Sequence, residues 1–303
     1  MAKAFCINFK QDDMITEAQK TTIATELFRL AGNGKRKTEQ FKFSQVELAV
    51  KLGVSNGTVS NMIAGKWQNI ADSMWRKVQA TLKIDLNWKT AETSNFRLLT
   101  ELLRKAQETQ LTAAISYDAG IGKSEAYKAY ERNNDNVIYV ECKNYWQTKS
   151  YIKALLNACG IKAEGTKEEM IEAFISHVMT LENPLIIIDQ MDKLKEGAFD
   201  LFMDLYNDLF RCCGFIISGV PALEKRIIRG AKIDKIGYKE VLSRLGGTFI
   251  KLNPTSLEDV ITVCEANGLN DREEAEMIYH LSNGDLRIVK QKVKKHLLLN
   301  QAA

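Results

Sequence analysis

The feature that most restricts the fold is a glycine-containing loop between an apolar run and an amphipathic one. Residues 111–117 (LTAAISY) lead directly into residues 118–130 (DAGIGKSEAYKAY), the pattern of a buried strand, a tight loop and a helix. Backbone N–H groups of such a loop, with the positive N-terminus of the helix, surround a phosphate. The predicted phosphate-binding residues are Asp118, Ala119, Gly120, Ile121, Gly122, Lys123, Ser124 and Glu125.

Several residues of this loop have distinct expected roles. Gly120 and Gly122 let the backbone curl around the phosphates. Lys123 is expected to bind the β and γ phosphates of ATP, and Ser124 to bind Mg²⁺. The full pattern has glycine at the position of Tyr117, so a residue with a side chain must make the first turn. We expect ATP binding to tolerate this departure. The alternative, a glycine-rich turn with an incidental lysine, does not explain the flanking strand and helix.

A second motif, PLIIIDQMDKL (residues 184–194), predicts a buried strand that ends at Asp189. Asp189 is expected to hold Mg²⁺ through water, and Gln190 stands where such ATPases carry the glutamate that activates the attacking water. An amide cannot take a proton, so we expect hydrolysis to be slow or absent while ATP and Mg²⁺ still bind. A naturally weak ATPase and a Glu-to-Gln substitution that traps the ATP state are both open; the intact neighbouring sequence favours the second.

The remaining strands predict an α/β fold. Residues 136–142 (NVIYVEC) and 214–219 (GFIISG) read as strands, and alternation of strand and helix predicts a parallel sheet with ligand at its carboxyl edge. Ser218 is either a γ-phosphate contact or a hydroxyl satisfied within the protein. Arg244 precedes the last expected strand and suits an arginine finger that reaches a neighbouring copy's ATP. Arg287, in an all-helical segment, suits a sensor that closes over its own ATP. A surface salt bridge is the alternative for both arginines.

Residues 44–67 have the pattern of a helix-turn-helix. The letters SQVELAVKL and NGTVSNMIAGKW predict two helices, and GVS predicts the turn between them. We expect Gly53 to supply the left-handed residue of the turn and Ser55 to cap the second helix. The expected inner face consists of Val46, Leu48, Ala49, Leu52, Val54, Val59 and Ile63.

The polar side of the second helix predicts a DNA-reading surface. Small amides and hydroxyls read base edges, and lysine neutralises phosphate. The residues expected to face a major groove are Asn56, Thr58, Ser60, Asn61 and Lys66. A helical hairpin for protein contacts is the alternative, and the clean separation of the two faces favours DNA. Residues 13–31 and 70–83 read as further helices, and the basic loop 32–40 offers extra phosphate contacts.

Charge and cysteine distribution limit the functional classes. Residues 1–91 hold 14 Lys and Arg against 8 Asp and Glu, whereas the rest of the chain holds 28 against 30. A basic front region suggests nucleic acid as its partner, with a solvated basic face as the alternative. The six cysteines are scattered without CxxC spacing, and no apolar run is long enough to span a membrane. We therefore expect a cytoplasmic protein in a reducing compartment.

The joint order of helix-turn-helix, GxGKS, DQMD, SRL and GDLR resembles the MuB/TnsC-like family of AAA+ transposition target-delivery ATPases. The resemblance spans nearly the whole chain. It implies an AAA+ P-loop NTPase with a parallel α/β sheet and a small helical lid, preceded by an all-α helix-turn-helix domain. The expected boundaries are residues 1–91 for the DNA-binding domain, 92–252 for the ATPase core and 253–303 for the lid.

The resemblance also implies a function. Members form ATP-dependent helical filaments on double-stranded DNA, non-specific in sequence, which recruit or activate a DDE transposase and disassemble through ATP hydrolysis. A sequence-specific helix-turn-helix regulator switched by ATP is the competing hypothesis, and a helicase or replication-protein loader is a third. If the family mode holds, DNA runs along the filament axis, with solvated lysines as the alternative reading. The expected DNA contacts are Lys143, Asn144, Tyr145, Thr148 and Lys149 in one segment, and Lys225, Arg226, Arg229, Lys232 and Lys235 in another.

Overall fold

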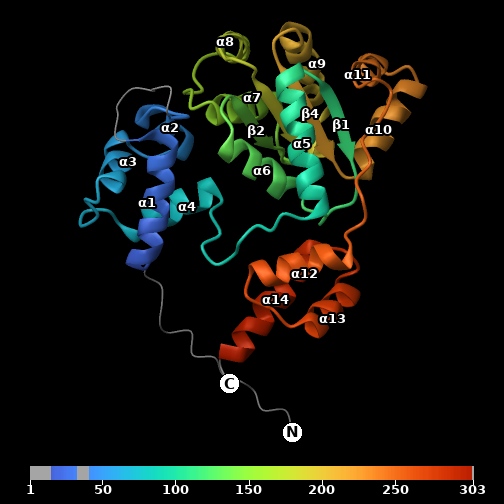
Figure 1. Cartoon of the computed structure of the whole chain (residues 1–303). Helices are drawn as coiled ribbons and strands as arrows, with labels where there is room; N and C mark the ends of the chain where they lie inside the picture. Colours follow the sequence, from blue (N-terminus) through green and yellow to red (C-terminus); the bar gives the residue numbers. More distant parts are fainter. Residues whose placement is uncertain (1–14, 33–40, 302–303) are drawn as a thin grey trace. The chain divides into compact units, whose positions relative to one another are not determined.

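The chain folds into two compact units in a computed structural model that describes residues 15–32 and 41–301. A front unit contains the described residues up to Trp88 together with Gly160–Lys162, and a larger unit contains the rest of the described chain from Lys89 (Figure 1). Cys6 and most of the expected basic loop, residues 33–40, lie outside the described residues. Within the described residues, no helix is both long enough and apolar enough to cross a membrane.

The front unit is a small helical bundle. Its helices are α1 (Glu17–Ala31), α2 (Gln45–Leu52), α3 (Asn56–Ile63) and α4 (Asp72–Leu82). Ser44 and Glu47 form a capping box at the start of α2, and the Ser55 hydroxyl accepts a hydrogen bond from the Thr58 N–H at the start of α3. Gly53 ends α2 with φ of 63°, the left-handed conformation expected for the turn. The two predicted helices and the turn between them are therefore present.

Three details of the front unit differ from the sequence-based expectation. Val46 was expected in the core, but its side chain is 50% exposed. Gln45 is buried in its place, and its Nε2 donates to the Gly32 carbonyl at 2.9 Å. Met62 is fully buried, whereas Ile63 is only partly so. Lys66 lies beyond the end of α3 and not on the helix, because that helix is shorter than its letters suggested.

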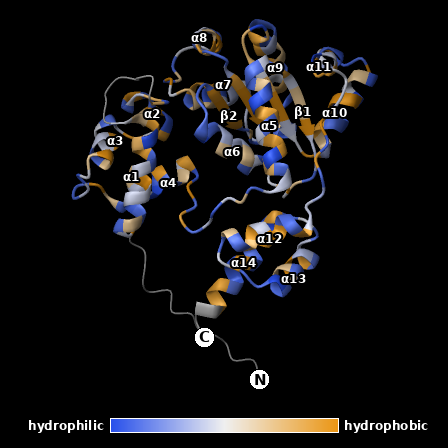
Figure 2. Ribbon diagram, in the orientation of Figure 1, coloured by the Kyte–Doolittle hydropathy of each residue, from blue (hydrophilic) through white to orange (hydrophobic). Residues whose placement is uncertain are grey.

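A four-stranded parallel sheet forms the centre of the larger unit. The strand order is β1-β4-β3-β2, and Figure 2 colours the middle of the sheet, around the label β4, as hydrophobic. Their bounds are β1 Thr112–Ser116, β2 Val137–Glu141, β3 Leu185–Asp189 and β4 Gly214–Gly219. The expected last strand is reduced to one parallel bridge between Ile115 and Ile250. The predicted α/β sheet with nucleotide-binding topology is confirmed.

Alternating side chains send each strand's residues to opposite faces of the sheet. Ile115, Ile187 and Ile216 pack in one cluster with residues of α5 (Ser94–Thr109) and α6 (Lys123–Asn133). On the other face, the ring of Phe215 meets that of Phe202, at a centroid distance of 5.9 Å, on α9 (Glu196–Leu209). The glycine-containing loop connects β1 to α6, the helix that packs on the first of these two faces.

The remaining elements of the larger unit are helices (Figure 1). Helix α7 lies against β2, and α10 lies against β1 and β4. The C-terminal part is wholly helical, as expected for a lid. The bounds are α7 Thr148–Ala158, α8 Lys167–Met179, η1 Met191–Lys193, α10 Pro221–Lys232, α11 Tyr238–Arg244, α12 Leu257–Ala266, α13 Arg272–Ser282 and α14 Leu286–Gln301.

Candidate nucleotide site and DNA-facing segments

The loop between β1 and α6 has the backbone of a phosphate-binding loop. Gly120 and Gly122 adopt φ of 84° and 93°, conformations that disfavour any residue with a side chain. Tyr117 does not adopt a left-handed conformation; its N–H donates to the Gly219 carbonyl at 3.3 Å and so extends the pairing of β1 with β4. A side chain is compatible with this backbone, so the departure from glycine leaves the loop intact.

Lys123 lies inside this loop at the start of α6. Its ammonium donates to the carbonyl oxygens of Tyr117 and Asp118 at 2.6 and 2.7 Å, and only 8% of the residue is exposed. Burial lowers the pKa of Lys123, partly offset by nearby Asp189 and Asp118. A buried ammonium group at the start of a helix, held by the carbonyl oxygens of this loop, is suited to bind the phosphates of a nucleotide.

Two side chains whose oxygen atoms could bind a magnesium ion lie next to each other. The Ser124 hydroxyl donates to Asp189 Oδ2 at 2.5 Å, and the Tyr139 hydroxyl donates to the same oxygen at 3.1 Å. Asp189 is only 1% exposed, and burial raises the pKa of its carboxyl group against the lowering effect of these hydrogen bonds. Mg²⁺ prefers oxygen ligands and retains several waters. Ser124 and Asp189 therefore fit a Mg²⁺ that accompanies a nucleotide.

Gln190, directly after Asp189, contacts a carboxylate on the neighbouring strand. Its backbone is left-handed, with φ of 56°, and its Nε2 donates to Glu141 Oε1 at 3.2 Å. The Lys193 ammonium donates to the Gln190 side-chain oxygen, and Lys143 pairs with Glu141 Oε1 at 3.1 Å. Sequence reasoning did not single out Glu141. A polar residue at a strand end is a weak signal until the strand order places it beside Asp189.

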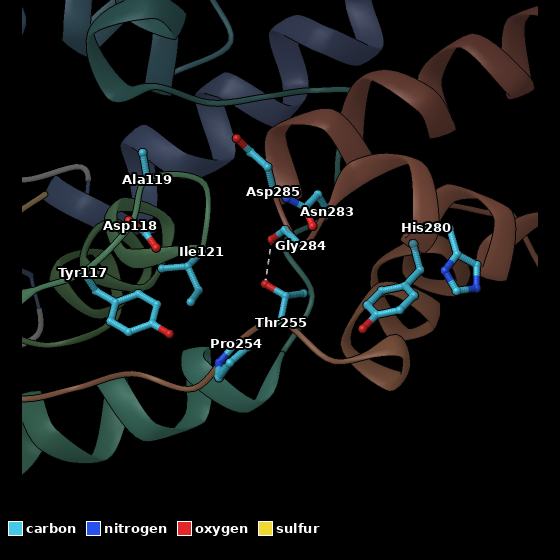
Figure 3. Close-up of a pocket in the computed structure, with 11 residues that line it drawn as sticks. Tyr117, Asp118, Ala119, Ile121, Pro254, Thr255, His280, Asn283, Gly284 and Asp285 are labelled. Atoms are coloured by element: carbon cyan, nitrogen blue, oxygen red, sulfur yellow. Dashed lines mark hydrogen bonds between the residues drawn. The ribbon is translucent and has the colours of Figure 1, made fainter. Parts of the chain in front are cut away.

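A cavity of about 490 Å³ lies between the loop and the lid, a volume within the range of small-ligand sites. Figure 3 shows the loop residues facing Asn283, Gly284 and Asp285 across it. Thr255 Oγ1 donates to the Gly284 carbonyl at 2.7 Å and joins the segment before the lid to the lid itself. The lining residues that sequence reasoning missed are Pro254, Thr255, Tyr279, His280, Asn283, Gly284 and Asp285.

The lid touches the phosphate-binding loop directly. The Leu286 N–H donates to the Gly120 carbonyl at 2.8 Å, and a Cβ atom on Gly120 would lie 2.1 Å from Asp285 Oδ1. Arg287 follows in the chain, and its guanidinium pairs at 2.6 Å with Asp285, which lines the cavity. The candidate sensor is thus near the loop, and in this structure it is engaged by an acidic neighbour.

The other two candidate catalytic residues lie in contrasting environments. Ser218 is fully buried, and its hydroxyl accepts a hydrogen bond from the Tyr127 hydroxyl at 3.0 Å. This geometry matches the alternative of a strand-end hydroxyl satisfied within the protein. Arg244 ends α11 with its side chain 41% exposed, 3.5 Å from Glu240 and stacked over the Tyr206 ring. It is available at the surface, where an arginine finger would have to be.

The first candidate DNA segment is the connection between β2 and α7. Tyr145 is 75% exposed, and Asn144 and Lys149 are exposed as well. Thr148, the first residue of α7, is partly buried. Lys143 is directed to Glu141 and is 40% exposed.

The second candidate segment runs along α10 and the following loop. Lys225, Arg229 and Lys232 are exposed. Arg226 is engaged within the protein, because its guanidinium donates to the Leu194 carbonyl at 2.6 Å and to the Tyr238 hydroxyl at 2.9 Å. Its side chain is 22% exposed. Lys235 pairs with Glu196 at 2.7 Å.

The polar residues of the helix-turn-helix divide into two sets. Asn61 and Lys66 are exposed, whereas Asn56, Thr58 and Ser60 are only partly so. The Thr58 hydroxyl lies 2.8 Å from that of Ser55, so part of its hydrogen-bonding capacity is used in the cap. Asn61 and Lys66 are the most accessible members of the predicted DNA-reading surface.

Comparison with known proteins gives one family model and two relatives, and the three matches are consistent. A family model described as an AAA domain matches residues 106–227, the part that contains β1, the loop, β3 and β4. The chain is 22% identical over 269 residues to the ATP-dependent target DNA activator B of Escherichia phage Mu, and equally to that of Escherichia phage D108. Each match covers 84% of this chain and 83% of the relative. The unmatched remainder is shorter than the stretch before Lys89, so the similarity extends beyond the AAA domain into the front unit.

Proposed function

We propose that this chain, a MuB-like AAA+ protein, is an ATP-dependent activator of target DNA in transposition. The observation that carries the proposal is the extent of the similarity to the two phage target DNA activators, which covers 84% of the chain. A match confined to the AAA domain would have supported nucleotide binding alone. A match that also reaches the front unit supports a function in which nucleotide and DNA are used together.

The nucleotide site supports ATP as the controlling ligand. The loop would wrap the phosphates, Lys123 would bind the β and γ phosphates, and the cavity beside Thr255 and Asn283 would take the base and ribose. Ser124 and Asp189 would hold Mg²⁺, which neutralises phosphate charge when bound. Gln190 alone predicts slow or absent hydrolysis, because its amide cannot accept the proton of the attacking water. That expectation remains a prediction.

Assembly on DNA is the next part of the proposal. Exposed Arg244 would reach the ATP of an adjacent copy, so that ATP would favour a helical homo-oligomer. Exposed basic residues, among them Lys149, Lys225 and Arg229, would contact the phosphate backbone of double-stranded DNA. Contacts of this kind are tolerant of sequence and weaken with salt. The assembled protein would then recruit or activate a DDE transposase.

A nucleotide-switched, sequence-specific regulator is the second candidate. It is favoured by the closed hydrophobic core of the front unit and the capped α3, which together give a rigid helix with exposed Asn61. Such a protein would protect a single operator, whereas a target activator would bind in proportion to DNA length. DNA preference therefore separates the two functions.

The test is negative-stain imaging of the full chain with random-sequence duplex DNA, in ATP, in ADP and without nucleotide. We expect filaments or rings on DNA in ATP only. Small particles in all three conditions would overturn the assembly proposal. Footprinting on a long duplex is the companion measurement, and a single protected site would support the regulator instead.

A further inference from the structure

Glu141 places a second carboxylate at the phosphate-binding edge of the sheet. It is the last residue of β2, and in the parallel register of β2 and β3 it lies opposite Asp189. Residues at alternate positions of a strand share a face, and Val137 and Tyr139 belong to the face that packs with α6. Tyr139 also donates to Asp189 Oδ2. Glu141 therefore lies on the same face as the Asp189 carboxylate.

The contacts of Glu141 hold its carboxylate in position. Gln190 Nε2 donates to Glu141 Oε1 at 3.2 Å, and the Lys143 ammonium lies 3.1 Å from the same oxygen. Lys193 donates to the other end of the Gln190 amide, which fixes the amide with its NH₂ group toward Glu141. The carboxylate is 19% exposed, so water can reach it. The result is a hydrogen-bonded pair of an amide after Asp189 and a carboxylate on the adjacent strand.

We propose that Glu141 is the general base of ATP hydrolysis in this chain, a role that the residue at position 190 cannot fill. The proposal rests on the nucleotide site proposed above. Water attacks the γ-phosphorus, and the bond from that phosphorus to the β–γ bridging oxygen breaks. ADP leaves with the electron pair, inorganic phosphate forms, and Glu141 takes the proton of the attacking water. Gln190 orients the carboxylate through its amide.

Two other carboxylates at this edge are less suited to the role. Asp189 already accepts hydrogen bonds from Ser124, Tyr139 and the Gln190 N–H, and it is the expected Mg²⁺ ligand. The Asp192 carboxylate accepts a hydrogen bond at 3.3 Å from the N–H of Val220, the residue that follows β4. Of these three carboxylates, Glu141 alone is hydrogen-bonded to the side chain of Gln190, which occupies the usual position of the base.

The test compares steady-state ATP hydrolysis by full-length variants with duplex DNA present. Glu141→Gln should lower kcat by about 100-fold or more, the usual contribution of a general base, and leave KM for ATP within about threefold. Glu172→Gln, an exposed carboxylate on α8, is the matched control and should change neither constant. The proposal is overturned if Glu141→Gln keeps kcat within about threefold of the starting protein, or if Asp192→Asn causes the large loss instead.

An exchange variant separates chemistry from folding. Glu141→Gln combined with Gln190→Glu restores the amide–carboxylate pair in the opposite sense, and we expect kcat to recover to within about tenfold of the starting protein. A merely structural role for Glu141, as an anchor for Lys143, predicts no recovery, because position 141 is still an amide. Gln190→Glu alone should raise kcat by less than about tenfold. A rise of several orders of magnitude would mean that no base was present before.

Equilibrium binding of a fluorescent ATP analogue distinguishes failure of this inference from failure of the proposed function. If the starting protein binds no ATP, the nucleotide site itself is wrong. If it binds ATP but hydrolyses none with DNA, the site stands and Glu141 is not a working base. If it binds and hydrolyses ATP and Glu141→Gln loses only hydrolysis, both proposals are supported.

Discussion

The front unit and the phosphate-binding edge of the sheet, called here the nucleotide edge, are stabilised by different kinds of contact. The contacts differ in how far apart their residues lie in the sequence. In the front unit the helix caps join residues three positions apart, as in the pairs Ser44–Glu47 and Ser55–Thr58. At the nucleotide edge, Ser124 and Asp189 are 65 positions apart, and Glu141 and Gln190 are 49 apart. The first kind of contact follows from a few adjacent letters, whereas the second exists only after the sheet has formed.

This difference separates what mutations in each region should affect. Core substitutions in the front unit should change stability and DNA binding but not nucleotide chemistry. Substitutions at the nucleotide edge should change chemistry while the front unit stays folded. The predictions below test this separation, beginning with the largest expected effect.

The largest effect concerns the proposed arginine finger. Arg244→Ala should lower hydrolysis in the assembled protein by about 1,000-fold, because an arginine finger stabilises the charge of the transition state, and ATP binding should stay unchanged. Steady-state ATPase assays and analogue binding measure the two quantities. Arg211→Ala, another exposed arginine, is the control. Equal loss of ATP affinity and turnover would contradict a role between copies.

The next effect tests the front unit's core. Leu48 is fully buried, so Leu48→Ala should lower the free energy of unfolding of this unit by about 3 kcal/mol. Urea denaturation followed by tryptophan fluorescence and circular dichroism measures it. Val46→Ala, on the same helix but half-exposed, should cost less than about 0.5 kcal/mol. A change in ATP affinity of more than about threefold in either variant would break the separation between the two regions.

Removal of the buried cation in the phosphate loop should weaken nucleotide binding. Lys123→Ala should raise the Kd for ATP about 100-fold, equivalent to about 2.8 kcal/mol, because a charge-assisted contact to the phosphates is lost. Lys128→Ala, one turn further along α6 and paired with Glu125, provides the comparison. If the Lys123 variant binds ATP as tightly as the starting protein, the loop is not the phosphate-binding site.

The smallest effect concerns DNA binding by the front unit. Lys66→Ala should raise the Kd for duplex DNA about fivefold and reduce the salt slope by about 1, as expected for one lost phosphate contact. Fluorescence anisotropy over a salt series measures both values. Arg29→Ala removes the same charge from α1 and should not alter the slope. An unchanged slope in the Lys66 variant would mean that this residue does not contact phosphate.

Features encoded locally were predicted well from the sequence. The strand–loop–helix around Gly120 and Gly122, the buried strand ending at Asp189, and the caps at Gly53 and Ser55 all depend on residues close together in the chain. Propensity, periodicity and capping chemistry act at that range. The fold class followed from these features, because alternating strands and helices leave few ways to pair the strands.

Features that depend on distant partners were predicted poorly. The hydrogen bonds of Arg226 to Leu194 and Tyr238 were not predicted, because both partners are distant in the chain. Val46 looked buried because only the helix period was visible, whereas Gln45 had a partner at Gly32. The lid half of the cavity was missed because Thr255 and Asn283 meet the loop only through tertiary packing.

The hydrogen bond between Glu141 and Gln190 has a consequence for how relatives of this chain are classified. The Gln190 amide donates and the Glu141 carboxylate accepts in this hydrogen bond. Changing Gln190 to glutamate would leave two carboxylates facing each other, and changing Glu141 to glutamine would leave two amides. Substitutions at the two positions should therefore covary, with acid and amide exchanging places. A search for active ATPases that reads only the residue after Asp189 would discard chains of this kind, whereas a search that reads both positions together would retain them.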